Sequence, residues 1–348
     1  MKYLWFLLLI CLLPGQVSAG EGRANLFIYH RFGEPRHAST NVDLDTFRAH
    51  LETLRKNKAQ VVRLGDVVRR LEHGGLGEEA FVVLTVDDGF RSFLRAFEML
   101  RQYGYPVTLF VNTDAVGGGS YLSWEELATL HDRGVEIGGH TASHPHMVNR
   151  LDGESREAWL ERLRTDLRRS REAFRQHLGF VPDLFAYPYG EYDSDVQSLV
   201  RQFGFRAAVA QQSGVVHDAS DLFALPRFPM GGPYASIASF REKLAMRPLR
   251  VLSARPASPV LSGENPPVLE LVVEAGELIA EQLTCYVSGQ GRGVVEWLDR
   301  AEGRLRITAR EPLRGRRGKY TLTAPGRAGG WHWYSHLWIR PEIDESGY

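Results

Sequence analysis

Up to about residue 245, short unbroken apolar runs alternate with stretches in which apolar residues recur three and four positions apart. The runs predict buried strands, and the spaced stretches predict amphipathic helices. Residues 43–58, for example, would carry Leu44, Phe47 and Leu51 on one helical face. The predicted strands are 26–29, 61–64, 81–86, 107–111, 135–137, 184–186, 205–209 and 223–225, and the predicted helices are 43–58, 66–71, 92–103, 123–133, 155–178 and 194–203.

Strands that alternate with helices indicate βα units and a mainly parallel sheet. Roughly seven such units precede residue 245, which is close to a full barrel. The sequence therefore predicts an α/β fold with a distorted or incomplete (β/α) barrel.

The pattern changes near Met246-Arg247-Pro248. Short apolar segments at regular spacing follow, which indicates a small antiparallel β-sandwich. Its predicted strands are 268–273, 284–287, 304–308, 320–323 and 331–339. We therefore divide the chain into an α/β domain, residues 20–245, which carries the candidate chemistry described below, and a C-terminal β-sandwich accessory domain, residues 246–348.

Two features of the C-terminal part have open interpretations. The basic run Arg314, Arg316, Arg317 and Lys319 is typical of a solvated hairpin tip, or could contact an acidic polymer. Trp331 and Trp333 alternate along one predicted strand and so share a face. That face would lie in the core or at a domain interface, or would stack on sugars.

The N-terminus has the pattern of a secretory signal peptide, residues 1–19. Lys2 precedes the apolar residues 3–13, and Val17-Ser18-Ala19 fits a cleavage site. The apolar part is too short to span a bilayer comfortably. We expect an exported protein, periplasmic or secreted, without stable membrane insertion after cleavage.

Composition limits the classes of partner and the means of stabilisation. Acidic and basic residues balance at 42 each, so nothing in the charge favours nucleic acid. Apolar residues make up 43% of the chain, enough for a sizeable core. Removal of the signal would leave Cys285 as the single cysteine, and hence no internal disulfide.

Three polar segments follow predicted strands and carry the candidate chemistry. They are Asp87-Asp88-Gly89, His140 to His144, and Tyr187-Pro188-Tyr189-Gly190. Each alone is also a plain turn or tight loop. Because barrel strands end at one rim, we expect the three segments to converge there. Two imidazoles and one carboxylate would then form a three-ligand metal site with a position open for water.

These motifs, in this order, resemble those of the polysaccharide deacetylases, the NodB-homology group close to carbohydrate esterase family 4. The resemblance covers residues 24–230. It implies that Asp87 is the catalytic base and that the Tyr189 backbone N–H helps to bind the oxyanion. It further implies that Asp88, His140 and His144 hold one divalent metal, usually Zn²⁺, although Co²⁺, Ni²⁺ or Fe²⁺ suit the same donors.

The implied activity is the removal of N-acetyl groups from N-acetylhexosamine units of a polysaccharide. The sequence departs from the family pattern at two points. Ala186 stands where many members have an arginine that orients the base, and no Leu-x-x-His supplies the general acid. His30 and His217 are the candidates for that role near the substrate, and Tyr187 is a candidate wall of the sugar site.

In these departures the sequence resembles the exported poly-N-acetylglucosamine deacetylases, which also lack the full motif set. They favour a bacterial exopolysaccharide or cell-wall glycan as substrate, and exopolysaccharide export machinery as a further partner. Two other functions stay open. The chain could be an exported carbohydrate-binding protein on a catalytically weakened barrel. It could also be a glycoside hydrolase, although that chemistry needs carboxyl groups about 5–9 Å apart across the sugar bond.

Overall fold

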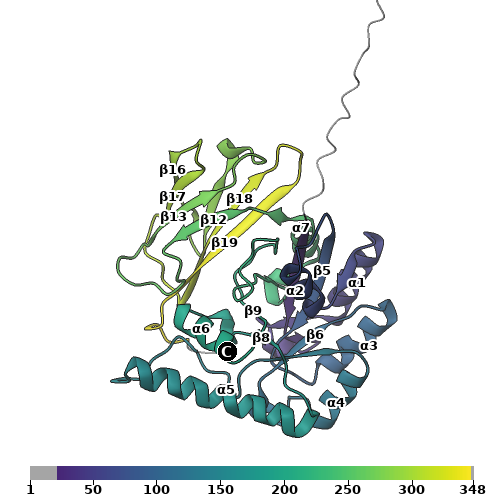
Figure 1. Cartoon of the computed structure of the whole chain (residues 1–348). Coiled ribbons are helices and arrows are strands. Elements are labelled where there is room, and N and C mark those ends of the chain that lie inside the picture. Colours follow the sequence, from purple (N-terminus) through teal and green to yellow (C-terminus); the bar gives the residue numbers. More distant parts are fainter. Residues whose placement is uncertain (1–21, 346–348) are drawn as a thin grey trace, which may run out of the picture.

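The computed structural model describes residues 22–345, and its larger layer is an eight-stranded parallel sheet. The strand order is β10-β1-β5-β6-β7-β8-β9, with β4 paired to β5. This curved sheet with helices on its outside confirms the predicted incomplete (β/α) barrel (Figure 1). The strands are β1 Arg23–Tyr29, β4 Gln60–Val62, β5 Ala80–Val86, β6 Thr108–Val111, β7 Glu136–Gly139, β8 Leu184–Ala186, β9 Ala207–Val209 and β10 Phe228–Pro229.

Six of the helices lie where apolar spacing predicts them, within one to two residues at most ends. Ser123 and Glu126 form the reciprocal capping box that begins one of them. A seventh helix, α7, was not predicted, because Phe240 is its one buried residue and no apolar stripe marks it. The helices are α1 Leu44–Lys56, α2 Leu64–Glu72, α3 Phe93–Tyr103, α4 Trp124–Asp132, α5 Arg156–Leu178, α6 Ser194–Gln202 and α7 Ile237–Ala245.

Alternation along β5 explains where the first aspartate points. Phe81 and Val83 lie in the barrel interior, whereas Val82 and Leu84 pack against the outer helices. Side chains two apart share a face of a strand. Asp87 therefore continues the inward series beyond Val86 and is fully buried.

The barrel nearly closes between its first and last strands. Leu225 forms a parallel bridge to Val209 on β9, and β10 pairs with β1 a few residues later. The predicted strand 223–225 is thus reduced to a single bridge. This connecting segment also carries Arg227, whose side chain has no exposed surface.

Residues after α7 form two facing sheets with a common apolar core. One sheet has the order β11-β19-β18-β14-β15 and the other β12-β13-β17-β16. The five predicted strands are present. The strands are β11 Arg247–Pro248, β12 Val251–Arg255, β13 Val268–Val273, β14 Thr284–Val287, β15 Gly291–Arg292, β16 Val294–Asp299, β17 Arg304–Thr308, β18 Arg317–Pro325 and β19 Trp331–Ile339. The division at residue 246 stays a prediction.

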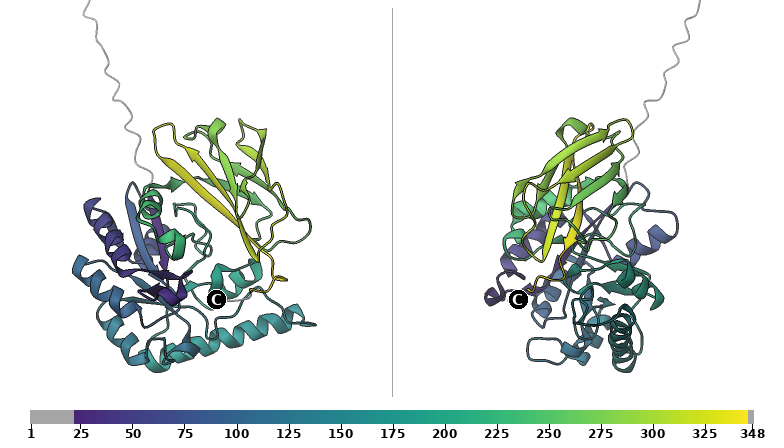
Figure 2. Two further views of the ribbon diagram at one scale, coloured as in Figure 1. Left: turned by 180° about the vertical axis from the view of Figure 1, so that it is seen from behind. Right: turned by 90° about the vertical axis from the view of Figure 1, so that its left-hand side faces the viewer.

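The β-sandwich packs on one side of the barrel, and both views of Figure 2 show its strands beside the barrel layer. A buried ion pair joins the two parts. Arg316 donates to both carboxylate oxygens of Glu191 at 2.7 and 2.6 Å, and neither side chain is more than 2% exposed. The expectation of a solvated basic hairpin tip is therefore wrong for Arg316.

Two observations concern membranes and cysteine. Within residues 22–345, no helix is both long enough and apolar enough to cross a bilayer. The predicted signal peptide, residues 1–19, lies outside the described residues. Cys285 is a free thiol buried in the sandwich core.

Candidate metal centre and active site

Neighbouring strands end in register, and this brings the candidate residues to one rim. The Asp87 N–H donates to the Tyr29 carbonyl at 2.9 Å, so His30 and Asp87 follow adjacent strands at the same level. The His140 N–H likewise donates to the Val111 carbonyl at 3.0 Å. Three segments far apart in sequence thus meet at the carboxyl ends of parallel strands.

Asp88, His140 and His144 direct one ligand atom each toward a common point. Asp88 Oδ1 lies 3.3 Å from Nε2 of both imidazoles, and the two Nε2 atoms are 3.1 Å apart. A tetrahedral centre with bonds of about 2.0–2.1 Å needs ligand atoms roughly 3.3–3.4 Å apart. The three side chains therefore fit a small divalent cation with a fourth position left for another ligand.

The protonation of His140 is set from behind the site. Its Nδ1 lies 2.7 Å from the Ala186 carbonyl oxygen. Because a carbonyl only accepts, Nδ1 carries the hydrogen and Nε2 presents its lone pair to the centre. This arrangement is typical of metal-binding histidines. Ala186 thus contributes to the site through its backbone carbonyl.

A buried carboxylate on α5 holds the loop between the two histidines. Asp166 accepts hydrogen bonds from the backbone N–H groups of Ala142 and Ser143 at 2.8 and 3.1 Å, and from the Ser143 hydroxyl at 2.6 Å. Thr141 accepts from the His144 N–H at 3.0 Å. These bonds fix His144 relative to His140.

Asp87 lies under the metal-binding group and is held by a buried arginine. Arg227 donates to Asp87 Oδ1 and Oδ2 at 2.7 and 2.8 Å, and also to the Thr85 hydroxyl and the Ala210 carbonyl. Burial raises the pKa of Asp87, but the charge and hydrogen bonds of Arg227 lower it by more. Asp87 is therefore an ionised, rigidly oriented carboxylate.

The second aspartate is kept ionised in a different way. Burial raises the pKa of Asp88, and the two imidazoles against its carboxylate, His140 and His144, lower it by more, so that this pKa lies well below its usual range. The charge of His30 lowers the pKa of both aspartates.

Backbone strain is concentrated at this rim. Among residues 22–345, five non-glycine residues have positive φ, and four belong to the site: Asp88, Thr141, His144 and Tyr189. Such conformations cost about 1–3 kcal/mol each and persist where the surroundings enforce them. At Asp88 the positive φ ends the strand alternation, and its carboxylate lies at the rim, where it lines the cleft.

Tyr189 occupies the third segment, a single turn at Pro188–Gly190 that follows β8. Its ring stacks on His146 with centroids 3.8 Å apart and meets His144 edge-on at 4.5 Å. Gly190 is required next to it, because a Cβ there would lie 2.5 Å from the Gln211 backbone nitrogen. The turn therefore sets Tyr189 against the candidate metal centre.

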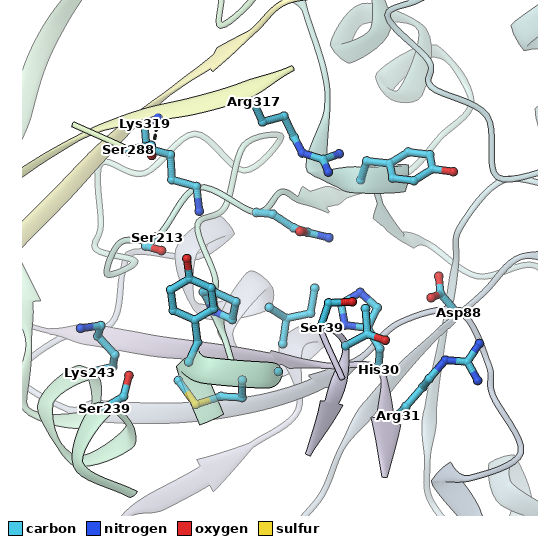
Figure 3. Close-up of a pocket in the computed structure, with 18 of the residues that line it drawn as sticks. His30, Arg31, Ser39, Asp88, Ser213, Ser239, Lys243, Ser288, Arg317 and Lys319 are labelled. Atoms are coloured by element: carbon cyan, nitrogen blue, oxygen red, sulfur yellow. Dashed lines mark hydrogen bonds between the residues drawn. The ribbon is translucent and has the colours of Figure 1, made fainter. Parts of the chain in front are cut away.

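A cleft of about 1600 Å³ opens above this group. Asp88, His140, His144, His30 and Tyr189 line it on the barrel side, and residues of β14, β18 and β19 line it on the other. Figure 3 shows His30 and Asp88 at one end of this pocket. The predicted catalytic and metal residues are thus brought together, with Asp87 buried directly beneath.

Two residues predicted to bind substrate lie elsewhere. Val216 bridges Ala24 near the start of β1, which places His217 at the opposite end of that strand from His30 and outside the cleft. Tyr187 is fully buried, donates its hydroxyl to the Phe223 carbonyl and packs in the core. The geometry argues against a substrate role for either side chain and leaves His30 as the candidate proton donor.

Sequence reasoning missed two supporting residues. Asp166 shares a helical face with Leu163 and Leu167, so a carboxylate on a buried stripe was a detectable signal. Arg227 stands between Leu225 and Phe228 in an apolar stretch, and a charge there also needs a buried partner. Neither signal names the partner, because that contact depends on the tertiary fold.

Comparison with known proteins supports the family resemblance. A family model described as polysaccharide deacetylase matches residues 75–208. The poly-beta-1,6-N-acetyl-D-glucosamine N-deacetylase of Escherichia coli is 28% identical over 225 residues, which cover 54% of this chain and 33% of that protein. The chain thus spans about a third of that relative's length.

Two solved structures share the fold. The Streptococcus pyogenes deacetylase PplD, in complex with acetate, is 20% identical with a TM-score of 0.57, and the match covers 64% of this chain and 99% of that one. IcaB from Ammonifex degensii is 22% identical with a TM-score of 0.57, over 65% of this chain and 97% of that one.

Proposed function

Since this chain contains a polysaccharide deacetylase domain over residues 75–208, we propose that it is a metal-dependent hydrolase that removes N-acetyl groups from N-acetylhexosamine units of a polysaccharide. The observation that carries the proposal is the pairing of a metal-sized group, Asp88, His140 and His144, with an adjacent ionised carboxylate, Asp87. A protein that only bound sugars would have no use for such a base.

The chain's own residues divide the work as follows. A divalent cation at Asp88, His140 and His144 would polarise the acetamide carbonyl and acidify a water molecule. We propose Zn²⁺, with Co²⁺, Ni²⁺ or Fe²⁺ as substitutes that suit the same donors. Asp87 accepts the proton of the attacking water, and Arg227 keeps its carboxylate oriented and charged before that transfer.

The later steps need a hydrogen-bond donor and an acid. The Tyr189 backbone N–H would donate to the oxyanion of the tetrahedral intermediate, and the position of Tyr189 against His144 supports this role. His30, on the same rim, gives a proton to the departing amine of the sugar. The products are acetate and a glucosamine-type unit in the polymer.

The substrate and location are also proposals. The name of the Escherichia coli relative supports an exopolysaccharide that contains N-acetylhexosamine units as substrate. Residues 1–19 support export to the periplasm or beyond, where exopolysaccharide export machinery would be a natural partner.

The two alternative functions have weaker support. The missing arginine at position 186 favours a binding protein, but Arg227 holds the base from the segment before β10. A glycoside hydrolase would need a second carboxylate across the sugar, and among described residues Glu242 is the other carboxylate that lines the cleft. Glu242 is already paired with Lys243 at 3.0 Å.

The test is acetate release from N-acetylglucosamine oligomers with β-1,4 and β-1,6 linkages. The protein is assayed metal-loaded, with chelator, and as Asp87→Asn, and metal content is measured in parallel. We expect chelator-sensitive acetate release that is lost in Asp87→Asn although metal stays bound. Release of reducing ends without acetate would instead support the hydrolase, and bound metal without either product would support the binding protein.

A further inference from the structure

The sheet that contains β18 turns one face to the sandwich core and the other to the barrel rim. Tyr320 and Leu322 of β18 are buried in the core, and Lys319 and Thr321, which alternate with them along the strand, line the cleft. Side chains of neighbouring strands extend this outer face, because they are paired with β18 in register. We call this face the platform, and define it by Tyr286, Lys319, Thr321, Thr323, Trp331 and Trp333.

Aromatic rings on the platform remain open to the cleft. Trp331 is 50% exposed and Tyr286 is 44% exposed. Trp333 instead packs edge-on against Phe228 of the barrel, with centroids 5.7 Å apart, and so fixes the platform relative to the rim. Exposed rings and hydroxyls across a cleft from a reactive centre are a suitable wall for a glycan.

The cleft has an excess of positive charge, although the whole chain is neutral. Most of these cations already have partners: Arg31 pairs with Glu34, Lys243 with Glu242, and Arg317 with Glu191. The charged lining residues are Arg31, Arg36, Lys243, Arg317 and Lys319 against Asp88 and Glu242.

Lys319 differs from these paired cations. Within residues 22–345, no carboxylate lies within ion-pair distance of its Nζ. Burial, followed by the charge of Arg317, lowers the pKa of Lys319 to about 8, so the ammonium is still charged near neutral pH. Figure 3 shows the Lys319 side chain directed into the pocket at the end away from Asp88.

A partly buried ammonium without a counter-ion is costly, and a bound anion would offset that cost. We propose that the platform is the second wall of the substrate cleft and that Lys319 binds the carboxylate of an acidic sugar. The substrate would then be an acidic glycan in which a uronic acid neighbours the N-acetylhexosamine. The deacetylation step rests on the function proposed above, whereas the acidic-sugar site does not.

The probe is an oligosaccharide in which N-acetylglucosamine alternates with glucuronic acid, compared with the same compound after methyl esterification of its carboxyl groups. Binding of both to the metal-loaded full chain is measured by calorimetry at low ionic strength. We expect the acidic form to bind roughly tenfold more tightly, as for a hydrogen bond between charged groups. Lys319→Met should abolish this preference, and Lys319→Arg should keep it.

Two further variants separate the effect of the Lys319 charge from the effect of the aromatic platform. Lys56→Met removes an exposed lysine at the end of α1 and should leave the preference unchanged. Trp331→Ala should weaken the acidic and the esterified forms by the same factor. Unchanged affinity of Trp331→Ala for both forms would overturn the proposal that the platform is the second wall of the cleft. A preference for the acidic form that survives in Lys319→Met would overturn the acidic-sugar site.

Acetate release from the same compounds distinguishes this inference from the function on which it builds. Lys319-dependent binding of the acidic form without acetate release would keep the acidic-sugar site and reject the deacetylase. Acetate release with equal affinity for both forms would keep the deacetylase and reject the acidic-sugar site.

Discussion

Arg227 holds both carboxylate oxygens of Asp87, at 2.7 and 2.8 Å, in a pair with no exposed surface. The two residues are 140 positions apart: Asp87 follows β5, and Arg227 belongs to the segment before β10 that closes the barrel. A further bond from the same guanidinium reaches the hydroxyl of Thr85, two residues before Asp87. The Asp87 carboxylate thus has one orientation, set by the segment that closes the barrel.

Replacement of Arg227 should separate charge from geometry. Arg227→Lys keeps a cation but loses the bidentate contact, so Asp87 would stay ionised yet less well oriented. We expect kcat for acetate release to fall at least tenfold with unchanged metal content. Arg227→Met leaves an unpaired buried carboxylate and should lower the free energy of unfolding by about 3–5 kcal/mol.

Urea unfolding and metal analysis of both variants test this expectation. Wild-type kcat in Arg227→Lys would show that the bidentate contact is unnecessary for the base. Arg48→Lys, at an exposed arginine of α1 outside the cleft, is the matched control and should leave kcat and unfolding unchanged.

Much of this architecture was accessible from sequence because it depends on local pattern. Buried runs and helical spacing located β5, β7 and β8, and the ends of parallel strands placed Asp88, His140 and Tyr189 on one rim. The reasoning used only periodicity and the rule that parallel strands end together.

What sequence could not supply are contacts between distant segments. In the sequence, Arg227 is an isolated charge in an apolar stretch. Its partner Asp87 is brought close only when β10 pairs with β1. In the sequence, Arg316 belongs to a basic run that predicts a solvated residue. In the structure it is buried and paired with Glu191. Tyr187 lies away from the cleft for a local reason. Its side chain points to the same side as that of Phe185 and enters the core, whereas Tyr189, in the turn that follows, lines the cleft.

His30 should matter only for leaving groups that need a proton. We expect His30→Gln to lower kcat for the sugar acetamide by about 10²–10⁴-fold, the usual worth of a general acid. An aryl acetate ester releases a stable phenolate that needs no proton, so hydrolysis of this ester should change little in His30→Gln. The ratio of the two rates is the measurement.

His217→Gln is the matched control for this experiment, because the other histidine considered for the same role lies outside the cleft. It should leave both rates unchanged. An equal loss of ester and amide hydrolysis in His30→Gln would mean that His30 positions the site and does not donate the proton.

Acid sensitivity of the fold should depend on a histidine far from the metal group. His50 is buried between the Ala235 carbonyl, 2.8 Å from its Nε2, and the Tyr29 hydroxyl, 3.0 Å from its Nδ1. Burial lowers the pKa of His50 to about 4, against the opposing hydrogen bond to Ala235. The folded protein therefore keeps this imidazole neutral where the unfolded chain protonates it.

The sign follows from proton uptake by the unfolded state between about pH 6.5 and pH 4. The contribution of the neutral His50 to the free energy of unfolding is fully present above about pH 6.5. It is lost as the pH drops toward 4, by about 2.5 kcal/mol between pH 7.5 and 4.5. In His50→Gln this part of the loss should disappear. Urea unfolding at the two pH values tests it, and an unchanged pH dependence would contradict the assignment.

The buried pair of Arg316 and Glu191 should couple the β-sandwich to the active-site turn. Glu191 also accepts from His146, at 2.9 Å, and the His146 ring stacks on Tyr189. Burial raises the pKa of Glu191, and the hydrogen bonds of Arg316 and His146 lower it by more, so this carboxylate is charged. Loss of its main partner would leave that charge in the core.

We expect Arg316→Met to lower the free energy of unfolding by about 3–5 kcal/mol, and the double variant Arg316→Met with Glu191→Leu to recover much of that loss, because no charge remains unpaired. Acetate release should fall in both, because His146 and Tyr189 lose their support in each. Arg314→Met, from the same basic run but 87% exposed in its side chain, should change neither quantity. Full activity in the double variant would show that the β-sandwich stabilises the barrel without positioning Tyr189.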